Sequence, residues 1–377
     1  MSPPRFILML LAATLLPGCR SAVDMRCRHE GAARTPVPEL GRFARLPHKR
    51  VGCLPFTGPL TLFEAADPAH LGGHSYSGRV SPGPDGWEVE RGMMYARRGG
   101  FVDLCHVRLA ADLVAYLHPR FRHALLHDWS CFRVRGEEPS LYHVTIRYPE
   151  WWSDLEAAER EALIDDLSIR LAQHLALTMT SWHELLTWFG FKSAVIFSEK
   201  GSAFTWEDSS SHALGVWMAG EALRREGSYD EAMTEVLAQT LEDLQVTDEA
   251  VLGRAIDAVK GDWWDGLSTR RRNLDIGLDD GVVEPWLVPG MQAEEGALLA
   301  AFTLPTLNAV RGRDCSGVME VEITPRVLES GLIFALLPER PSRVIHPKED
   351  LPILLAHIAS CYDEGLTTPG GVELAQE

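Results

Sequence analysis

The sequence lacks any apolar run long enough to cross a membrane. A transmembrane helix needs about 20 consecutive apolar residues, whereas the most pronounced run covers only 6–16, close to the N-terminus. Positive charge is also scarce. The chain has 36 Lys and Arg against 53 Asp and Glu, which gives a formal net charge of −17. Such an acidic protein has no long-range field that attracts polyanions, so we expect no nucleic acid partner.

Several familiar catalytic and metal-binding motifs are missing as well. The cysteines show no CxxC or zinc-knuckle spacing, and no GxSxG elbow accompanies the serines at 209–211. The Asp- and Gly-rich loop at 275–281 does not follow the EF-hand pattern. These absences argue against a zinc knuckle, a nucleophile-elbow hydrolase and an EF-hand.

The N-terminus is typical of a secreted lipoprotein. After the apolar run, residues 16–19 read LPGC, which resembles the lipobox of bacterial lipoproteins. The resemblance implies that Cys19 is the acylated first residue of the mature chain and anchors it to the membrane through a lipid that includes palmitate. Arg20 stands where an inner-membrane retention signal has Asp, so we expect the outer membrane, facing the periplasm. Ordinary signal cleavage without acylation is the alternative.

Six further cysteines would remain in the mature chain: Cys27, Cys53, Cys105, Cys131, Cys315 and Cys361. An even set permits disulfides in an oxidising periplasm, although the sequence does not choose among the pairings. Our candidate bond joins Cys27 to Cys53. The alternative is that several are buried thiols.

Composition predicts a globular protein. Hydrophobic residues make up 46% and charged residues 24% of the 377 residues, enough apolar surface to build a core. We expect a lipoprotein signal peptide over 1–18, a tether and loop-rich region over 19–94, a helical core domain over 95–300, and an α+β segment over 301–377 packed on that core. The predicted class is α+β and predominantly helical, with a long central helix and minor short strands near both ends.

The longest periodic stretch predicts that central helix. Apolar residues recur at spacings of three and four from Leu155 to Leu186, Ser153 and Glu156 match a capping box, and Gly190 supplies a stop. The length favours a kink or break near 174–180. Further helices are expected at 205–225, 229–241, 248–259 and 351–362, and strands at 141–146, 317–324 and 332–336.

One polar pair, His183 and Glu184, lies near the end of this helix. The pair begins an HExxH-like motif, but Thr187 occupies the position of the second His, which excludes a metalloprotease of that type. A buried Glu is costly unless it is paired, coordinates a metal or keeps its proton. Glu184 therefore needs a partner.

A second polar pair, Asp103 and His106, follows two glycines at the start of another predicted helix. Residues three apart share one face near a helix N-terminus. Together with His183 and Glu184 they offer two imidazoles and two carboxylates, which suit a divalent metal such as zinc, manganese or iron. We predict that these four residues form either a catalytic cluster, with or without a metal, or a structural hydrogen-bond network between helices.

Three adjacent arginines, Arg270, Arg271 and Arg272, form a candidate anion-binding clamp. Guanidinium groups bind phosphate and carboxylate through paired hydrogen bonds. The alternative is that they pair with the acidic residues of this chain.

Several separated segments resemble a family of proteobacterial lipoproteins known as a domain of unknown function. They read GGFVDLCHVR, WHELLTWFG, FSEKGSAFTWED and RRNLDIGLDDGVVEPW, within Tyr95 to Pro289. The resemblance implies that Asp103, His106, His183 and Glu184 fall in signature segments. It also implies Asn at position 212, where this chain has His212. The resemblance implies no activity, substrate or fold, because none is established for the family.

Two functions follow from these patterns. The first is a cell-envelope hydrolase that activates water at the His/Glu/Asp cluster to attack an ester, amide or glycosidic bond. The second is a non-catalytic envelope protein that binds peptidoglycan, a glycan or a protein partner. Tryptophan pairs such as Trp151-Trp152 and Trp263-Trp264 could stack on sugars, unless they pack in the core.

Overall fold

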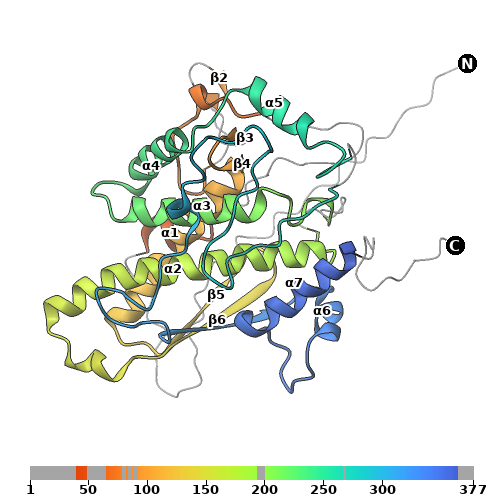
Figure 1. The fold of residues 1–377 in the computed structure, drawn as a ribbon. Helices are drawn as coiled ribbons and strands as arrows, with labels where there is room; N and C mark the ends of the chain where they lie inside the picture. The colour runs from red at the N-terminus through yellow and green to blue at the C-terminus, as the bar shows by residue number, and fades with distance from the viewer. Residues whose placement is uncertain are drawn as a thin grey trace, which may run out of the picture.

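The computed structural model describes residues 40–48, 65–78, 82–83, 86–87, 92–192, 200–265 and 269–363. Three helices, α1 (Leu104–Leu126), α2 (Ala157–Trp188) and α3 (Asp208–Leu223), pack against one another at its centre (Figure 1). Most of their side chains are buried, and they supply much of the main hydrophobic core. This arrangement confirms the predicted α+β class with a long central helix.

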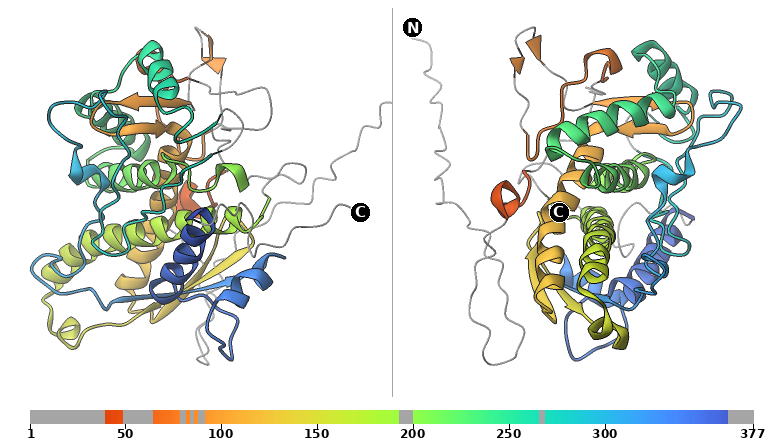
Figure 2. Two further views of the ribbon diagram at one scale, coloured as in Figure 1. Left: turned by 45° about the vertical axis from the view of Figure 1, so that its right-hand side comes forward. Right: turned by 90° about the vertical axis from the view of Figure 1, so that its left-hand side faces the viewer.

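A three-stranded antiparallel sheet lies on one side of the central helices. Its order is β5-β6-β7, formed by Cys131–Arg135, Ser140–Ile146 and Met319–Pro325. Strand β6 alternates buried and partly buried residues, as expected for a strand with one face on the core. The C-terminal helices α6 (Ser330–Leu336) and α7 (Pro347–Asp363) lie on this side as well, with α7 in contact with β7 and α2 (Figure 2). Residues 319–363 therefore pack on the helical core.

The opposite side carries a hairpin and two helices. Strands β3 (Met93–Ala96) and β4 (Gly100–Asp103) pair antiparallel, α4 (Tyr229–Asp243) contacts α3, and α5 (Glu249–Ala258) contacts β3. Aromatic side chains of the hairpin, Trp206, Trp263 and Trp264 form a second, smaller hydrophobic cluster. Strand β4 leads directly into α1, and this junction positions the site described below.

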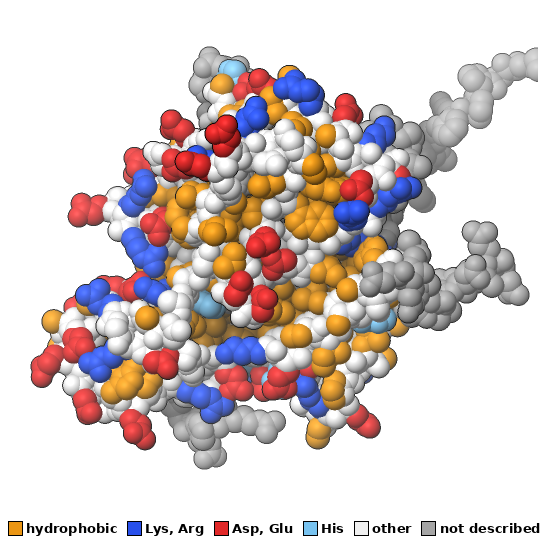
Figure 3. Space-filling view, in the orientation of Figure 1, with side chains coloured by type: hydrophobic (Ala, Val, Ile, Leu, Met, Phe, Trp, Pro, Cys, Tyr) orange, Lys and Arg blue, Asp and Glu red, His pale blue; other side chains and the backbone are white. Residues whose placement is uncertain are grey.

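Short elements complete the described chain. Strands β1 (Pro82–Gly83) and β2 (Gly86–Trp87) pair with each other, and single 3₁₀ turns occupy Gly41–Ala44, Pro68–His70, Glu150–Asp154, Lys200–Ser202 and Leu299–Phe302. Within the part of the chain that the structure describes, no helix combines the length and apolarity that a membrane crossing requires. On the face seen in Figure 3, basic and acidic side chains are interspersed around exposed hydrophobic ones. This face has no continuous basic surface.

The start of α2 differs from the prediction. Ser153 belongs to a 3₁₀ turn and donates its hydroxyl to the Glu150 carbonyl oxygen, while α2 begins after Glu156 without a side-chain cap. The predicted capping box is therefore wrong, because Ser153 is used by the preceding turn. The expected break near 174–180 is absent, since α2 is continuous and its C-terminal half is buried on nearly all sides. Such burial holds a long helix together through packing.

The segment at 332–336 is also not a strand. It forms the end of α6. A short apolar run does not distinguish a strand from a buried helix. The helices expected at 229–241, 248–259 and 351–362 are confirmed with small shifts of their ends.

The close approach of α1 and α3 depends on Gly215. A Cβ atom at this position would lie 2.1 Å from the carbonyl oxygen of Val107. Main-chain atoms cannot give way as a flexible side chain can, so any larger residue must separate the two helices. The approach also sets the spacing of the side chains that neighbour Val107 on α1 and Gly215 on α3.

We predict that Gly215→Ala lowers the free energy of unfolding by about 1–3 kcal/mol, because overpacking forces backbone shifts. The matched control is Gly253→Ala on α5, where nothing lies within 4 Å of the added methyl group. Since Ala is the better helix former, the control should be neutral or stabilise by up to about 1 kcal/mol. Urea denaturation of both variants makes the comparison. Equal effects would contradict the proposed contact.

Candidate metal centre

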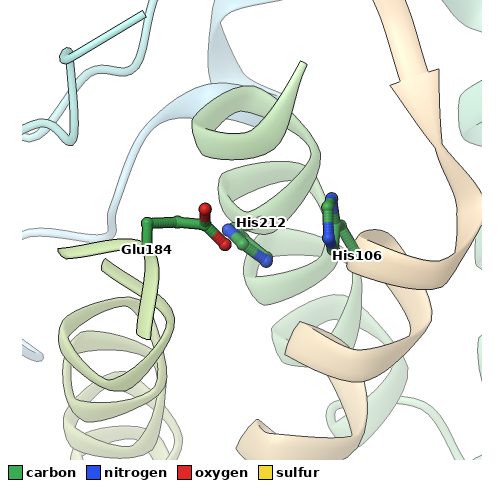
Figure 4. A group of neighbouring side chains, drawn as sticks. All are labelled: His106, Glu184 and His212. Atoms are coloured by element: carbon green, nitrogen blue, oxygen red, sulfur yellow. The ribbon is translucent and has the colours of Figure 1, made fainter. Parts of the chain in front are cut away.

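Three side chains from three helices converge inside the molecule. They are His106 on α1, Glu184 on α2 and His212 on α3, and one ligand atom from each lies within 4.8 Å of the others (Figure 4). The two imidazole rings lie 4.6 Å apart between centroids. Because nitrogen and carboxylate ligands bind zinc at about 2 Å, small side-chain adjustments would bring all three onto one ion.

The β4–α1 junction positions His106. Asp103 is the N-cap of α1, and its Oδ1 accepts a hydrogen bond of 2.7 Å from the Cys105 amide, which places His106 in the first helical turn. The Asp103 amide donates to Ser211 Oγ at 2.9 Å. Ser211 precedes His212 on α3, so one hydrogen bond ties together the two segments that carry the histidines.

Two carboxylates lie beside one nitrogen of His106. Nδ1 is 3.2 Å from Asp208 Oδ1 and 3.6 Å from Asp103 Oδ2, which leaves Nε2 available to a ligand. Burial alone would lower the pKa of His106, but the charges of Asp103 and Asp208 raise it to about 10. Carboxylates of this kind orient metal-binding histidines and increase their basicity.

Asp208 has a second task at the start of α3. Its Oδ2 accepts a hydrogen bond of 2.7 Å from the Thr205 amide, while Oδ1 faces His106. The predicted helix start at Thr205 is therefore nearly right: the Thr205–Asp208 pair closes the turn, and α3 begins at Asp208. One carboxylate thus fixes both the helix start and the orientation of an imidazole on another helix.

Glu184 reaches the centre from a fully helical position and is 4% exposed. Its Oε2 accepts a hydrogen bond of 3.2 Å from the Phe204 amide. Phe204 has a φ of 54°, in the left-handed region that a bulky residue rarely adopts. Burial and the charge of Asp208 outweigh the nearby histidines and raise the pKa of Glu184 to about 7.

His212 is 3% exposed. Burial, together with His106 and His183, holds the pKa of His212 well below its usual value. The ring is therefore neutral near pH 7, and a neutral imidazole is the form that binds metals.

The structure brings together three of the four residues predicted to cluster. Asp103, His106 and Glu184 meet, while the Nδ1 of His183 lies 3.7 Å from Oε2 of Glu138. Glu138 raises the pKa of His183 against the effect of burial. His212 completes the group. Its signal in the sequence is the four-residue step from Asp208, which puts both side chains on one helix face.

Sequence reasoning also missed Glu207, a buried carboxyl group next to the centre. Its Oε1 accepts a hydrogen bond of 2.8 Å from Thr205 Oγ1, and its Oε2 has no hydrogen-bond partner among the described residues. Burial, with Asp208 and Asp103 nearby, raises the pKa of Glu207 well above its usual value. Glu207 therefore binds a proton more tightly than an ordinary glutamate does.

The three arginines do not form a shared clamp. Arg270 and Arg271 are exposed and pair with Asp265 at 3.7 Å and Asp262 at 2.7 Å. Arg272 differs, because it donates to the backbone carbonyl oxygens of Ala203 and, at 3.4 Å, Gly201. Internal pairing thus accounts for two of the three.

The other predicted positions divide between described and undescribed parts of the chain. Cys19, Cys27 and Cys53 lie outside the described residues. Cys131 is disulfide-bonded, while Cys105, Cys315 and Cys361 are buried thiols.

None of the ten tryptophans whose side chains the structure describes is exposed. Trp152, Trp182, Trp188, Trp206, Trp263 and Trp264 are buried, and Trp129, Trp151, Trp217 and Trp286 are partly buried. They offer no open stacking surface for sugars.

Comparison with known proteins identifies the family. The chain belongs to the family described as Protein of unknown function (DUF4056), which it matches over residues 58–272. The match includes His106, Glu184 and His212. No match was found among the curated proteins or the solved structures.

We predict that Glu184→Gln alters the pH dependence of stability in metal-free protein. Because the pKa of Glu184 is raised to about 7, the folded protein keeps a proton that the unfolded chain releases near pH 4.5, so wild-type stability falls as pH rises through this window. Gln does not ionise. The stability of the variant relative to wild type should therefore increase by about 1–3 kcal/mol between pH 5 and pH 8.

Urea denaturation at the two pH values measures this difference. Glu242→Gln on α4, which replaces an exposed carboxylate, is the control and should show no such change. A Glu184→Gln difference that is the same at pH 5 and pH 8 would mean that Glu184 is ionised throughout.

Proposed function

We propose that this member of the family is a hydrolase of the cell envelope that holds one divalent metal ion, best matched by zinc, on His106, Glu184 and His212. The observation that carries the proposal is the convergence of these ligand atoms from three helices. Two histidines and one glutamate are the protein ligands of several catalytic zinc sites, which keep a further position for water or substrate. Structural zinc sites use mainly cysteine.

The charge balance of the centre supports a bound cation. Four carboxyl groups, from Asp103, Glu184, Glu207 and Asp208, lie around the two histidines, and burial together with the charge of Asp208 raises the pKa values of Glu184 and Glu207. Like charges in a buried site destabilise each other. A divalent cation would relieve this repulsion in place of the protons that the raised pKa values of His106 and Glu184 keep in the metal-free site.

The site also has the features that water activation requires. A bound metal of this type lowers the pKa of a coordinated water towards 7 and polarises a carbonyl group. Asp103 and Asp208 hold His106 in one orientation. The side chain of His106 is 23% exposed, while that of Asp208 is almost fully buried, so the centre lies closest to solvent at His106. An ester or amide is a suitable substrate for such a site.

A lipid-anchored location in the envelope is part of the proposal. It rests on the lipobox-like residues 16–19, and the disulfide bond of Cys131 fits an oxidising compartment. An outer-membrane anchor on Cys19 would place the site in the periplasm.

We predict that the purified protein binds one equivalent of zinc and that His212→Ala removes most of this affinity, because it deletes a ligand. Asp208→Asn should weaken binding by roughly 10–100-fold, the usual cost of losing a group that orients a ligand. Titration calorimetry with metal-free protein gives both values.

His183→Ala tests whether the ligands are His106, Glu184 and His212, or whether they include His183, as the sequence predicted. His183 faces Glu138, so the variant should keep its zinc affinity within a few-fold. Protein that contains no metal as purified and is not stabilised by zinc or manganese would remove the metal-dependent proposal. Loss of affinity in His183→Ala but not in His212→Ala would show that the wrong ligands have been assigned.

We predict that cells expressing the protein incorporate radiolabelled palmitate into it and that Cys19→Ser abolishes the labelling. Cys27→Ser is the matched control and should remain labelled. Unlabelled wild-type protein would contradict the lipid anchor without bearing on the metal centre.

A further inference from the structure

A pair of positive side chains lies near the C-terminal end of α2. The Lys200 Nζ atom is 5.2 Å from the centroid of the Trp188 ring, and the guanidinium carbon of Arg272 is 5.3 Å from that of Tyr362. The two aromatic residues are joined, because Trp188 Nε1 donates a hydrogen bond of 3.2 Å to the Tyr362 hydroxyl. Segments far apart in the sequence thus bring a lysine and an arginine together over linked rings.

Neither cation has an acidic partner among the residues that the structure describes. Arg270 and Arg271, the neighbours of Arg272 in sequence, both pair with aspartates, but no carboxylate of the described chain forms an ion pair with Lys200 or Arg272. This is unexpected in a chain with a net charge of −17. Burial and the charge of Arg272 lower the pKa of Lys200 to about 8, so Lys200 is mostly charged at pH 7.

The guanidinium group of Arg272 uses only part of its hydrogen-bonding capacity. Its Nη1 donates to the carbonyl oxygens of Ala203 and Gly201, while its buried Nε has no hydrogen-bond partner in the part of the chain that the structure describes. Nε and Nη2 form the edge of a guanidinium that binds a carboxylate or phosphate through two parallel hydrogen bonds. A buried donor without a partner usually has one in the functional state.

The cation pair is built into the same framework as the metal centre. Trp188 follows Glu184 by one helical turn, about 6 Å along α2. Arg272 holds the carbonyl oxygen of Ala203, and the next residue, Phe204, donates its amide to Glu184. The Asn273 amide in turn donates to the Phe204 carbonyl oxygen at 3.0 Å. The loop at 203–204 therefore fixes the cation pair relative to Glu184.

We propose that Lys200 and Arg272 form an anion subsite that binds a carboxylate or phosphate group of the substrate, beside Trp188 in the turn of α2 that follows Glu184. That the bound anion is part of a substrate rests on the proposed function. The inference narrows the substrate class to esters or amides that also carry an anionic group. Trp188 and Tyr362 supply the apolar floor beneath the two cations.

The test uses the five lysines of the chain as reporters. Reductive methylation with ¹³C-formaldehyde gives each lysine its own NMR signal, and Lys200→Arg identifies that of Lys200. Metal-free full-length protein is titrated with acetate and, separately, with inorganic phosphate, at constant ionic strength set with chloride. We expect the Lys200 signal to shift saturably with at least one of the two anions, and the better anion identifies the group that the subsite prefers.

Lys260 is the internal control. It also lies over a tryptophan, with Nζ 5.4 Å from the centroid of Trp264, but on the exposed surface, so its signal should not saturate. Arg272→Gln should weaken anion binding at least tenfold, whereas Arg271→Gln, which alters an exposed arginine already paired with Asp262, should leave it unchanged. Thermal denaturation checks that both variants are folded.

The outcomes separate this inference from the proposed function. No saturable shift of Lys200 with either anion, or equal weakening by Arg272→Gln and Arg271→Gln, overturns the anion subsite even if zinc binds. A saturable, Arg272-dependent shift supports the subsite even if zinc does not bind, because no metal is present in the titration. If Arg272→Gln is unfolded, the same titration is followed with the ¹⁵N signals of the Arg272 side chain. Lys200→Met should then weaken the anion binding that these signals report.

Discussion

The burial of Glu184 in the apolar half of α2 is the constraint on which the site depends. A carboxylate in such surroundings is costly unless neighbouring groups compensate for the loss of water. Here the compensation comes from other elements: an amide at Phe204, imidazoles on α1 and α3, and a proton retained because the pKa is raised. The left-handed conformation of Phe204 indicates that the loop before α3 is held in a strained form to supply one of these partners.

The partners that Glu184 needs are brought within reach by the close packing of α1 against α3. Gly215 lets the two helices approach until the added methyl group of any other residue would contact the Val107 backbone. His106 directly precedes Val107 on α1, and His212 precedes Gly215 on α3 by less than one turn. The contact that holds the core together therefore also sets the separation of the two imidazoles. Stability and site geometry cannot be varied independently here.

Much of the helical framework could be predicted from the sequence, and so could part of the site. Glu184 and the Asp103/His106 turn stood out because charged residues on apolar helix faces need partners. His183 was included because adjacency in sequence was taken for adjacency in space, although neighbouring residues on a helix point about 100° apart. His212 was left out because its helix has a weak amphipathic pattern and because the family resemblance implied Asn there. The Ser153 cap and the strand at 332–336 were wrong because both patterns are short, and competing local structures use the same residues.

The distribution of charge around α2 has a direct consequence for anything that binds there. Carboxyl groups surround the histidines, while Lys200 and Arg272, which have no acidic partner among the described residues, lie over rings beside the following turn of the helix. An acidic centre repels anions until a divalent ion occupies it, whereas the cation pair attracts them throughout. Under the proposed function, a ligand with one anionic end would therefore be oriented before its neutral, reactive end met the metal centre. Orientation of this kind lowers the barrier to reaction by removing freedom that a freely tumbling ligand would keep, and it requires that the two sites be rigidly connected. The loop at 203–204 makes that connection, because one of its residues accepts from Arg272 and the other donates to Glu184.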